Sequence, residues 1–266
     1  MMRRLYAGDH PSVAVLESSL AGLLYSRGDL AGAEPLYRES LEEKRRLFPG
    51  DHPSVATGLG NLGRLLQRRG RLAESEPLLR ESLAMNQRLF PGDNSNVADG
   101  LGYVAELSLD LGDSAEAERL ARESLAMMRR VFEGDHPDVA DGLSRLAGVL
   151  VARGQPENAE PFARDGVAMT ERTRGKNHWR TGSSRLELGR ALEDLRRFAD
   201  GESELVEAER DLSTTQGAPP GRHARCVEAL TRLFDSWHAA APGEGHDARA
   251  AEWRRKLDST GDGEKR

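Results

Sequence analysis

Gly50-Asp51-His52-Pro53-Ser54-Val55-Ala56 is one of four copies of the same short stretch, spaced 42 residues apart. The other three are Gly8-Asp9-His10-Pro11-Ser12-Val13-Ala14, Gly92-Asp93-Asn94-Ser95-Asn96-Val97-Ala98 and Gly134-Asp135-His136-Pro137-Asp138-Val139-Ala140, and a fainter fifth copy surrounds Asn177-His178. A fixed period of this size is typical of stacked supersecondary units, each of which buries its apolar face against the next. Such a stack favours a binding surface over a catalytic pocket.

The residues that follow each copy predict a pair of helices. After Pro53, the apolar residues Val55, Leu59, Leu62 and Leu66 recur in steps of four and three, which is the stripe of an amphipathic helix. Gly70 would end this helix, and a second would run from about Leu72 to Phe90 before Pro91-Gly92 stops it. We call the two helices of each repeat helix A and helix B.

Alignment of the copies shows a repeated pattern of small residues. Helix A carries Leu or Val followed by a small residue, and helix B carries small residues at two positions. These are Leu20-Ala21, Leu62-Gly63, Val104-Ala105, Leu146-Ala147 and Leu188-Gly189 on helix A, with Ala33, Ser75, Ala117, Ala159, Gly201 and then Ser40, Ser82, Ser124, Gly166, Ala208 on helix B. Small side chains let helix axes approach closely while the larger residue fills the gap, so these positions should form the core.

This pattern resembles the tetratricopeptide repeat, which has Leu-Gly in helix A and Ala-x-x-x-aromatic in helix B, as in Ala33 and Tyr37. The 42-residue unit, the Gly-Asp-His-Pro loop and the segment Ala33–Tyr37 are similar to the longer kinesin-light-chain subtype. The resemblance covers nearly the whole chain. It implies an all-α fold, a right-handed superhelical solenoid of antiparallel helix pairs, in which the A helices line a concave groove.

The repeat pattern also predicts how the chain is divided. Residues 1–10 match Met127 to His136, so they should be the tail of a truncated preceding repeat or a short remnant that caps the first unit. Residues 11–217 should form five repeats, residues 218–258 a divergent capping hairpin, and residues 259–266 a disordered tail. Ser213 to Gly221, rich in Ser, Thr, Gly and Pro, should be a loop.

Bulk composition excludes several classes of function. The net charge of −6 gives no support to nucleic-acid binding, and no apolar run reaches membrane-spanning length. The first residues lack the apolar core of a signal peptide, and the single cysteine, Cys226, excludes an intramolecular disulfide. We therefore expect a cytoplasmic protein.

Candidate chemistry is weak throughout the sequence. His10, His52, His136 and His178 occupy one position per repeat, but equivalent residues of stacked repeats should lie more than about 10 Å apart, so they should start helix A rather than bind one metal. Cys226 has His223 three residues before it but no further catalytic group, so it should be a buried core residue. No phosphate loop or kinase motif is present. The sequence predicts no enzyme activity, cofactor or metal.

The expected groove lining provides the candidate binding residues. Helix A positions beside the Leu-small pair differ from copy to copy, as in the series Ser19, Asn61, Tyr103, Arg145 and Glu187. The partner-binding candidates are Asn61, Arg64, Tyr103, Glu106, Arg145 and Arg190. An Asn amide can both donate to and accept from a peptide backbone, an Arg can clamp a carboxylate, and Tyr103 offers an aromatic platform.

The primary functional prediction is a scaffold that binds a segment of a partner protein in the groove. The alternative is a C-terminal regulatory or sensing region of a larger bacterial signalling protein, such as a serine/threonine kinase or an NTPase-linked regulator. The segment Ala250–Leu257 favours it, since it resembles the tail of repeat regions in some bacterial kinases. Self-association through exposed repeat ends is a further possibility.

Overall fold

A computed structural model describes residues 9–215, 217–218 and 221–261. Within this part of the chain there are twelve α-helices and no strand. They are α1 (Pro11–Ser26), α2 (Leu30–Leu47), α3 (Pro53–Arg68), α4 (Leu72–Leu89), α5 (Ser95–Asp110), α6 (Ser114–Val131), α7 (Pro137–Ala152), α8 (Pro156–Arg174), α9 (Trp179–Asp194), α10 (Phe198–Thr214), α11 (Arg222–Ala240) and α12 (His246–Gly261). The predicted all-α fold is confirmed.

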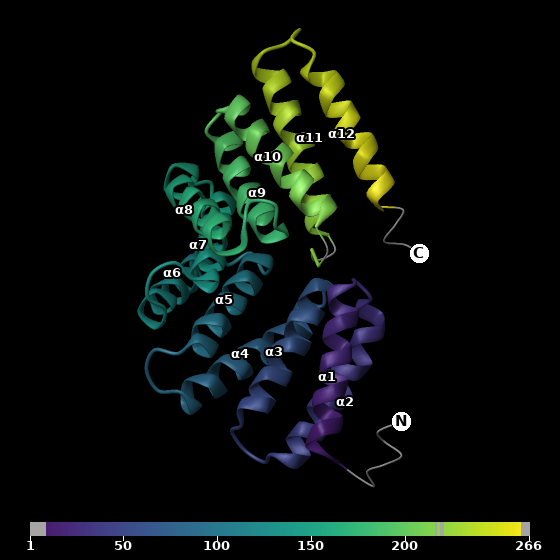
Figure 1. Ribbon diagram of the computed structural model, residues 1–266, viewed down its shortest axis with the longest axis vertical. Helices are drawn as coiled ribbons and strands as arrows, with labels where there is room; N and C mark the ends of the chain where they lie inside the picture. The colour runs from purple at the N-terminus through teal and green to yellow at the C-terminus, as the bar shows by residue number, and fades with distance from the viewer. Residues whose placement is uncertain (1–8, 216, 219–220, 262–266) are drawn as a thin grey trace. The chain divides into compact units, whose positions relative to one another are not determined.

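The helices fall into two compact units, divided between Val131 and Phe132. Unit 1 holds α1 to α6 and unit 2 holds α7 to α12. Within each unit, successive helices pack as hairpins, α1 with α2 and α3 with α4, then α7 with α8 and α9 with α10 (Figure 1). Odd-numbered helices are therefore the predicted A helices and even-numbered ones the B helices.

The repeated loop motif starts helix A and ties it to helix B of the same repeat. In the second repeat, the Ser54 N–H donates to His52 Nδ1 at 3.1 Å, so the imidazole caps the helix. His10, His136 and His178 cap α1, α7 and α9 in the same way, and Asn94 caps α5 with its side-chain oxygen. The prediction that the histidines start helix A is confirmed.

The aspartate of the motif has a second structural role. Arg88, near the end of α4, donates Nε and Nη2 to the two carboxylate oxygens of Asp51 at 2.6 and 2.8 Å. The same bidentate pair recurs as Asp9–Arg46, Asp93–Arg130 and Asp135–Arg172. The hydrogen bonds from arginine hold the pKa of these four aspartates below the usual range.

A residue with positive φ closes the turn within each of the first five hairpins. In four of them this residue is glycine, namely Gly28, Gly70, Gly112 and Gly154. In the fifth repeat Arg196 stands at this position with φ 58°, and it is the one residue other than glycine with positive φ in the described part of the chain. The fifth repeat therefore keeps the turn geometry without the residue that favours it.

The small residues permit close helix packing, as predicted. A Cβ on Gly63 would lie 2.7 Å from Leu79 Cγ, and Ser75 Oγ donates to the Gly63 carbonyl at 2.8 Å. Ser82 Oγ likewise donates to the Ala56 carbonyl across the helix pair. One core prediction is wrong: Leu20, unlike Leu62 (3% exposed), is 49% exposed, because none of the described residues lies over that face of α1.

Two boundaries in unit 2 differ from the predictions. Helix α10 continues to Thr214, so the expected loop loses Ser213 and Thr214 to the helix. Helix α12 continues to Gly261, three residues into the predicted tail. Residues 262–266 and 1–8, which carry the remaining tail and most of the predicted repeat remnant, lie outside the described residues.

Candidate partner-binding surfaces

The helix A surface of unit 1 brings two of the predicted binding residues into contact. The Arg64 guanidinium carbon lies 4.2 Å from the centroid of the Tyr103 ring, and Arg64 Nη1 donates to Tyr103 Oη at 3.3 Å. Tyr25 of α1 lies on the other side, with Arg68 4.6 Å above its ring and Arg64 at 6.0 Å. Four side chains from α1, α3 and α5 thus form one cation–π cluster, which we call the Tyr-Arg cluster.

The other two candidates of unit 1 lie on the same helices. Asn61 is one turn before Arg64 on α3, and Glu106 is one turn after Tyr103 on α5. Asn61, Arg64, Tyr103 and Glu106 are all partly exposed, while Leu62 and Val104 between them are buried. This side of unit 1 therefore presents partly exposed polar and aromatic side chains over an apolar layer.

Unit 2 presents a more closed helix A surface. Arg190 Nη1 donates to Glu187 Oε2 at 2.8 Å, so Arg190 is already held by a carboxylate of its own helix. The fifth-repeat members of the expected lining, Leu186 and Glu187, are 0% and 5% exposed, because α9 packs against α7, α8, α10 and α11. Arg145, on α7, is half-buried. The expected lining is therefore accessible in unit 1 and largely covered at α9.

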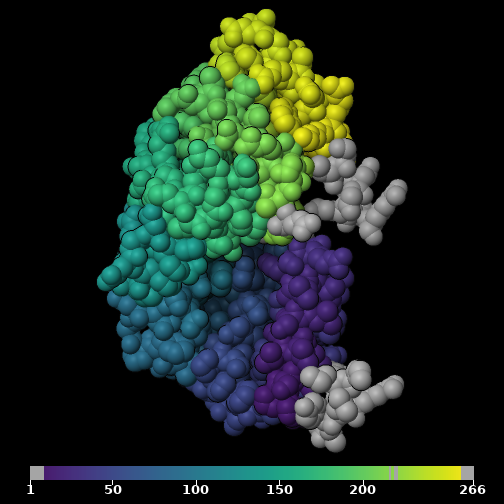
Figure 2. All heavy atoms as spheres, in the orientation of Figure 1, coloured from purple at the N-terminus to yellow at the C-terminus, as the bar shows by residue number. Residues whose placement is uncertain are grey.

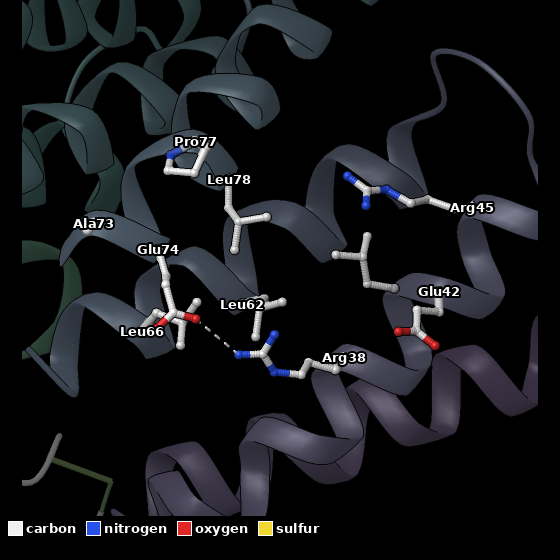
Figure 3. A pocket seen from close by; sticks show the side chains of 10 residues that line it. Arg38, Glu42, Arg45, Leu62, Leu66, Ala73, Glu74, Pro77 and Leu78 are labelled. Carbon is white, nitrogen blue, oxygen red and sulfur yellow. Dashed lines mark ion pairs between the residues drawn. The ribbon is translucent and has the colours of Figure 1, made fainter. Parts of the chain in front are cut away.

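A hollow of about 410 Å³ lies between α2, α3 and α4 of unit 1 (Figure 3). Its floor includes Leu41, Leu62 and Leu66, and Figure 3 shows Arg38 reaching across it toward Glu74, at 3.6 Å. One repeat further on, the equivalent pair is tighter, with Arg80 bidentate to Glu116 at 3.0 and 3.1 Å. The ion pair across the hollow is thus longer than the equivalent ion pair in the next repeat.

Helices α8, α9 and α10 of unit 2 hold a buried charge cluster. Arg185 of α9 is 8% exposed and pairs with Glu171 of α8 at 2.6 Å and with Glu204 of α10 at 3.3 Å. Glu207 also pairs with it, and Asp211 Oδ2 lies 4.0 Å from its Nε. Burial raises the pKa of Glu204 and of Asp211. We call this set of five residues the Arg185 cluster.

The remaining candidate chemistry is structural. Cys226 is fully buried, its thiol 3.4 Å from the Leu205 carbonyl, and burial raises the pKa of the thiol, so it is the expected core residue. His223 Nε2 lies 2.7 Å from Glu209 Oε1. Among the described residues, no group of His, Cys, Asp or Glu is placed to hold a metal ion, and no helix is long and apolar enough to cross a membrane.

Comparison with known proteins identifies the fold family. The tetratricopeptide repeat family matches residues 12–88 and 96–172, more than half of the chain, so the chain belongs to this family. This fold is typical of protein–protein interaction scaffolds, which are generally not catalytic. A search of curated proteins returns no match.

Solved structures with a similar fold include proteins of the kinesin-light-chain type. A putative kinesin light chain with nearly identical TPR-like repeats, from Podosopora anserina, is 22% identical over 78% of this chain and 99% of its own, with a TM-score of 0.61. BtubC (BKLC) from P. vanneervenii is 18% identical over 86% and 92%, with a TM-score of 0.64. A Rap protein complexed with Competence and Sporulation Factor is 14% identical over 98% and 77%, with a TM-score of 0.65.

Sequence reasoning missed three of these features. Tyr25 was not assigned to the binding surface, because it lies on the last turn of α1 while the series that we aligned lies earlier on the helix. The hollow lies between α2, α3 and α4 and the Arg185 cluster between α8, α9 and α10, and the sequence predicts no binding residue at either place. Position-by-position comparison would have found the Arg185 cluster, since Arg185 replaces Leu59, Leu101 and Leu143 of the second, third and fourth repeats.

Proposed function

We propose that this protein is a non-catalytic scaffold that binds an extended or helical segment of a partner protein on the helix A surface of unit 1. The observation that carries the proposal is the Tyr-Arg cluster, in which three successive A helices contribute side chains to one partly exposed site. Aromatic and arginine side chains are enriched where proteins bind one another, because they combine apolar area with hydrogen-bonding groups.

The stacked geometry suits binding without large rearrangement. Tyr25 and Tyr103 hold the planes of Arg68 and Arg64, which reduces the side-chain entropy that each arginine loses when a ligand binds. A partner segment lying across α1, α3 and α5 would meet these groups in succession, with Asn61 available for its backbone amides. This model places the main contacts in unit 1, with Arg145 and Arg190 outside them.

The test begins with peptides selected from a random phage-displayed library on the immobilised chain. A selected peptide is then titrated by fluorescence polarisation against a variant in which Asn61, Arg64 and Tyr103 are replaced by Ala. The matched control replaces three exposed helix B residues, Glu39, Glu81 and Gln87. We expect the first variant to lose affinity at least about tenfold and the control to stay within about twofold. Equal affinity for both variants, with helical circular dichroism intact, would refute the assignment.

A further inference from the structure

Helix α1 carries an uncovered apolar face. Val15, Leu16, Leu20 and Leu23 are 57%, 46%, 49% and 62% exposed, and they are four of the six large hydrophobic residues exposed in the described chain. Figure 2 shows the first repeat, in purple, at the surface of unit 1. Scattered exposed leucines need no explanation, but four on neighbouring turns of one helix indicate a contact surface. We call these four residues the α1 face.

Three of the four positions are buried in every other repeat, whereas the position of Val15 is there Thr57, Asp99, Asp141 or Ser183. The residues at the positions of Leu16, Leu20 and Leu23 are Gly58, Leu62, Leu65; Gly100, Val104, Leu107; Gly142, Leu146, Val149; and Ser184, Leu188, Ala191, all buried. In unit 1 the preceding B helix covers them: a Cβ at Gly58 would lie 3.1 Å from Leu41 Cδ1 of α2, and one at Gly100 would lie 3.1 Å from Leu83 Cδ1 of α4. The repeats themselves thus show that a B-type helix covers this face.

The opposite end of the chain does not supply such a helix. The exposed positions of α12 are mostly charged: Asp247, Arg249, Glu252, Arg254, Arg255 and Asp258, with Ala248 and Ala251. Stacking α12 of a second copy on the α1 face would bury charges against leucines, which is costly. By contrast, the sequence that leads into α1, Met1-Met2-Arg3-Arg4-Leu5-Tyr6, repeats the end of a B helix, Met127-Met128-Arg129-Arg130-Val131-Phe132.

Leu16 restricts which helix can bind. Three other repeats have glycine at its position. In unit 1 the facing position of the B helix is then leucine, with Leu41 facing Gly58 and Leu83 facing Gly100. In the fifth repeat the helix A position is the larger Ser184, and the corresponding position of the preceding B helix is the smaller Val167. Because a single Cβ at Gly58 would already be tight against Leu41, the side chain of Leu16 leaves no room for a leucine opposite.

We propose that the α1 face binds an amphipathic helix of the B type that has alanine, glycine or serine opposite Leu16, where α2 and α4 carry leucine. The apolar residues of such a helix cover Leu20 and Leu23, just as Leu41 packs on α3 at Gly58 and Leu83 packs on α5 at Gly100. This surface is separate from the Tyr-Arg cluster, and it is defined by residue size and apolarity, since none of its four residues is charged.

The experiment places a helix on the face in cis. A copy of residues Ser114–Ala126 is fused directly before Met1, which continues the sequence in the register of α6 and puts the equivalent of Leu125 opposite Leu16. Two fusions are made, one with Leu at that position and one with Ala. Each is combined with the natural chain, with Leu16→Gly, and with Leu20→Glu/Leu23→Glu. Thermal unfolding and amide hydrogen exchange of α1 are measured.

We expect the Ala fusion to raise Tm by about 4 °C or more and to slow exchange in α1 at least about tenfold, and Leu20→Glu/Leu23→Glu to abolish both effects. The Leu fusion should do the same only with Leu16→Gly. Equal effects of the two fusions on the natural chain, or no effect of the Ala fusion, would overturn the proposal. A natural chain that is dimeric by light scattering and monomeric as Leu20→Glu/Leu23→Glu would also overturn it, in favour of a second copy.

Discussion

The second and fifth repeats place opposite chemistry at the same two core positions. In the second repeat Leu59 and Met85 belong to one apolar cluster, 0% and 5% exposed. In the fifth, Arg185 and Asp211 occupy these positions and are 8% and 1% exposed. The helix pair forms in both. The scaffold is therefore specified by its caps, turns and small residues, while this pair of core positions can hold either apolar groups or ions.

The exchange involves more than two residues. Around Arg185, the positions of Arg45 and Leu78 become Glu171 and Glu204, and Glu207 keeps the glutamate found at Glu81. The buried guanidinium therefore has carboxylates from both neighbouring B helices. A buried charge costs several kcal/mol unless it is paired and hydrogen-bonded. The fifth repeat can thus bury an arginine because four residues differ together from the second repeat, while Glu207 keeps the glutamate found at Glu81. Changing Leu59 or Arg185 alone therefore tests the comparison.

The largest effect is expected from Leu59→Arg. The second repeat has Leu78 where the fifth has Glu204, and its Glu81 already pairs with Arg45, so the new guanidinium would lie in an apolar core. We expect a loss of about 4 kcal/mol or more in the free energy of unfolding. Urea denaturation followed by circular dichroism measures it, with Leu59→Met as the control that should cost less than about 1.5 kcal/mol. A loss below about 1 kcal/mol would contradict this account.

Arg185→Leu should be the next largest. It leaves Glu171, Glu204, Glu207 and Asp211 without their shared cation, and we expect unfolding to become easier by about 3 kcal/mol at pH 7. The double variant Arg185→Leu/Asp211→Met restores the pair found in the second repeat and should recover part of this loss. A double-mutant cycle by urea denaturation gives the coupling. Additive losses would show that the two residues do not act as a pair.

These differences indicate what the sequence could predict. The helix pairs, their turns and the histidine caps follow from features present in several copies, so the period exposes them. The exposed face of α1 could not be recognised in the same way, because Leu20 aligns with the buried Leu62 and the sequence pattern does not distinguish the two. The Arg185 cluster appears in one repeat, so it looks like a loss of pattern unless Arg185 and Asp211 are considered together.

The candidate site was predictable only in part for a related reason. Arg64 and Tyr103 were selected because they vary between copies, and the structure brings them into contact. Their contact with Tyr25 and Arg68 depends on the spacing of successive A helices, which residue patterns do not give. In unit 2 the same criterion selected Glu187 for the lining, although packing of α7 and α11 around α9 buries it.

A smaller effect with a definite sign is expected from Asp211→Asn. Burial raises the pKa of Asp211, so the folded chain holds this proton more tightly than the unfolded chain, and the associated stability is lost as pH rises through the folded pKa. An asparagine cannot ionise. Asp211→Asn should therefore be more stable than the natural chain at pH 7, and the difference should disappear as the pH falls below the unfolded pKa. We expect this gain to be smaller than the loss caused by Arg185→Leu.

Asp51→Asn is the matched control, with the opposite sign. The hydrogen bond from Arg88 lowers the pKa of Asp51, so its stabilisation is present above the unfolded pKa and is lost as pH falls through the folded pKa. This variant should be less stable than the natural chain at pH 7 and should approach it in acid. Urea denaturation at several pH values measures both variants, and the same sign for the two would contradict the contrast between ion pair and buried cluster.

The smallest effect is expected where the second and fifth repeats agree. His52 and His178 both cap helix A by accepting the N–H two residues ahead, and Asn94 makes the same contact with its side-chain oxygen in the third repeat. His52→Asn and His178→Asn should therefore change the free energy of unfolding by less than about 0.5 kcal/mol, whereas His52→Ala and His178→Ala should each cost about 1 kcal/mol. Thermal and urea unfolding compare the four variants. If Asn proves as costly as Ala, the imidazole contributes more than a cap, and its stacking on Phe48, 3.9 Å between ring centroids, would be the contact to test next.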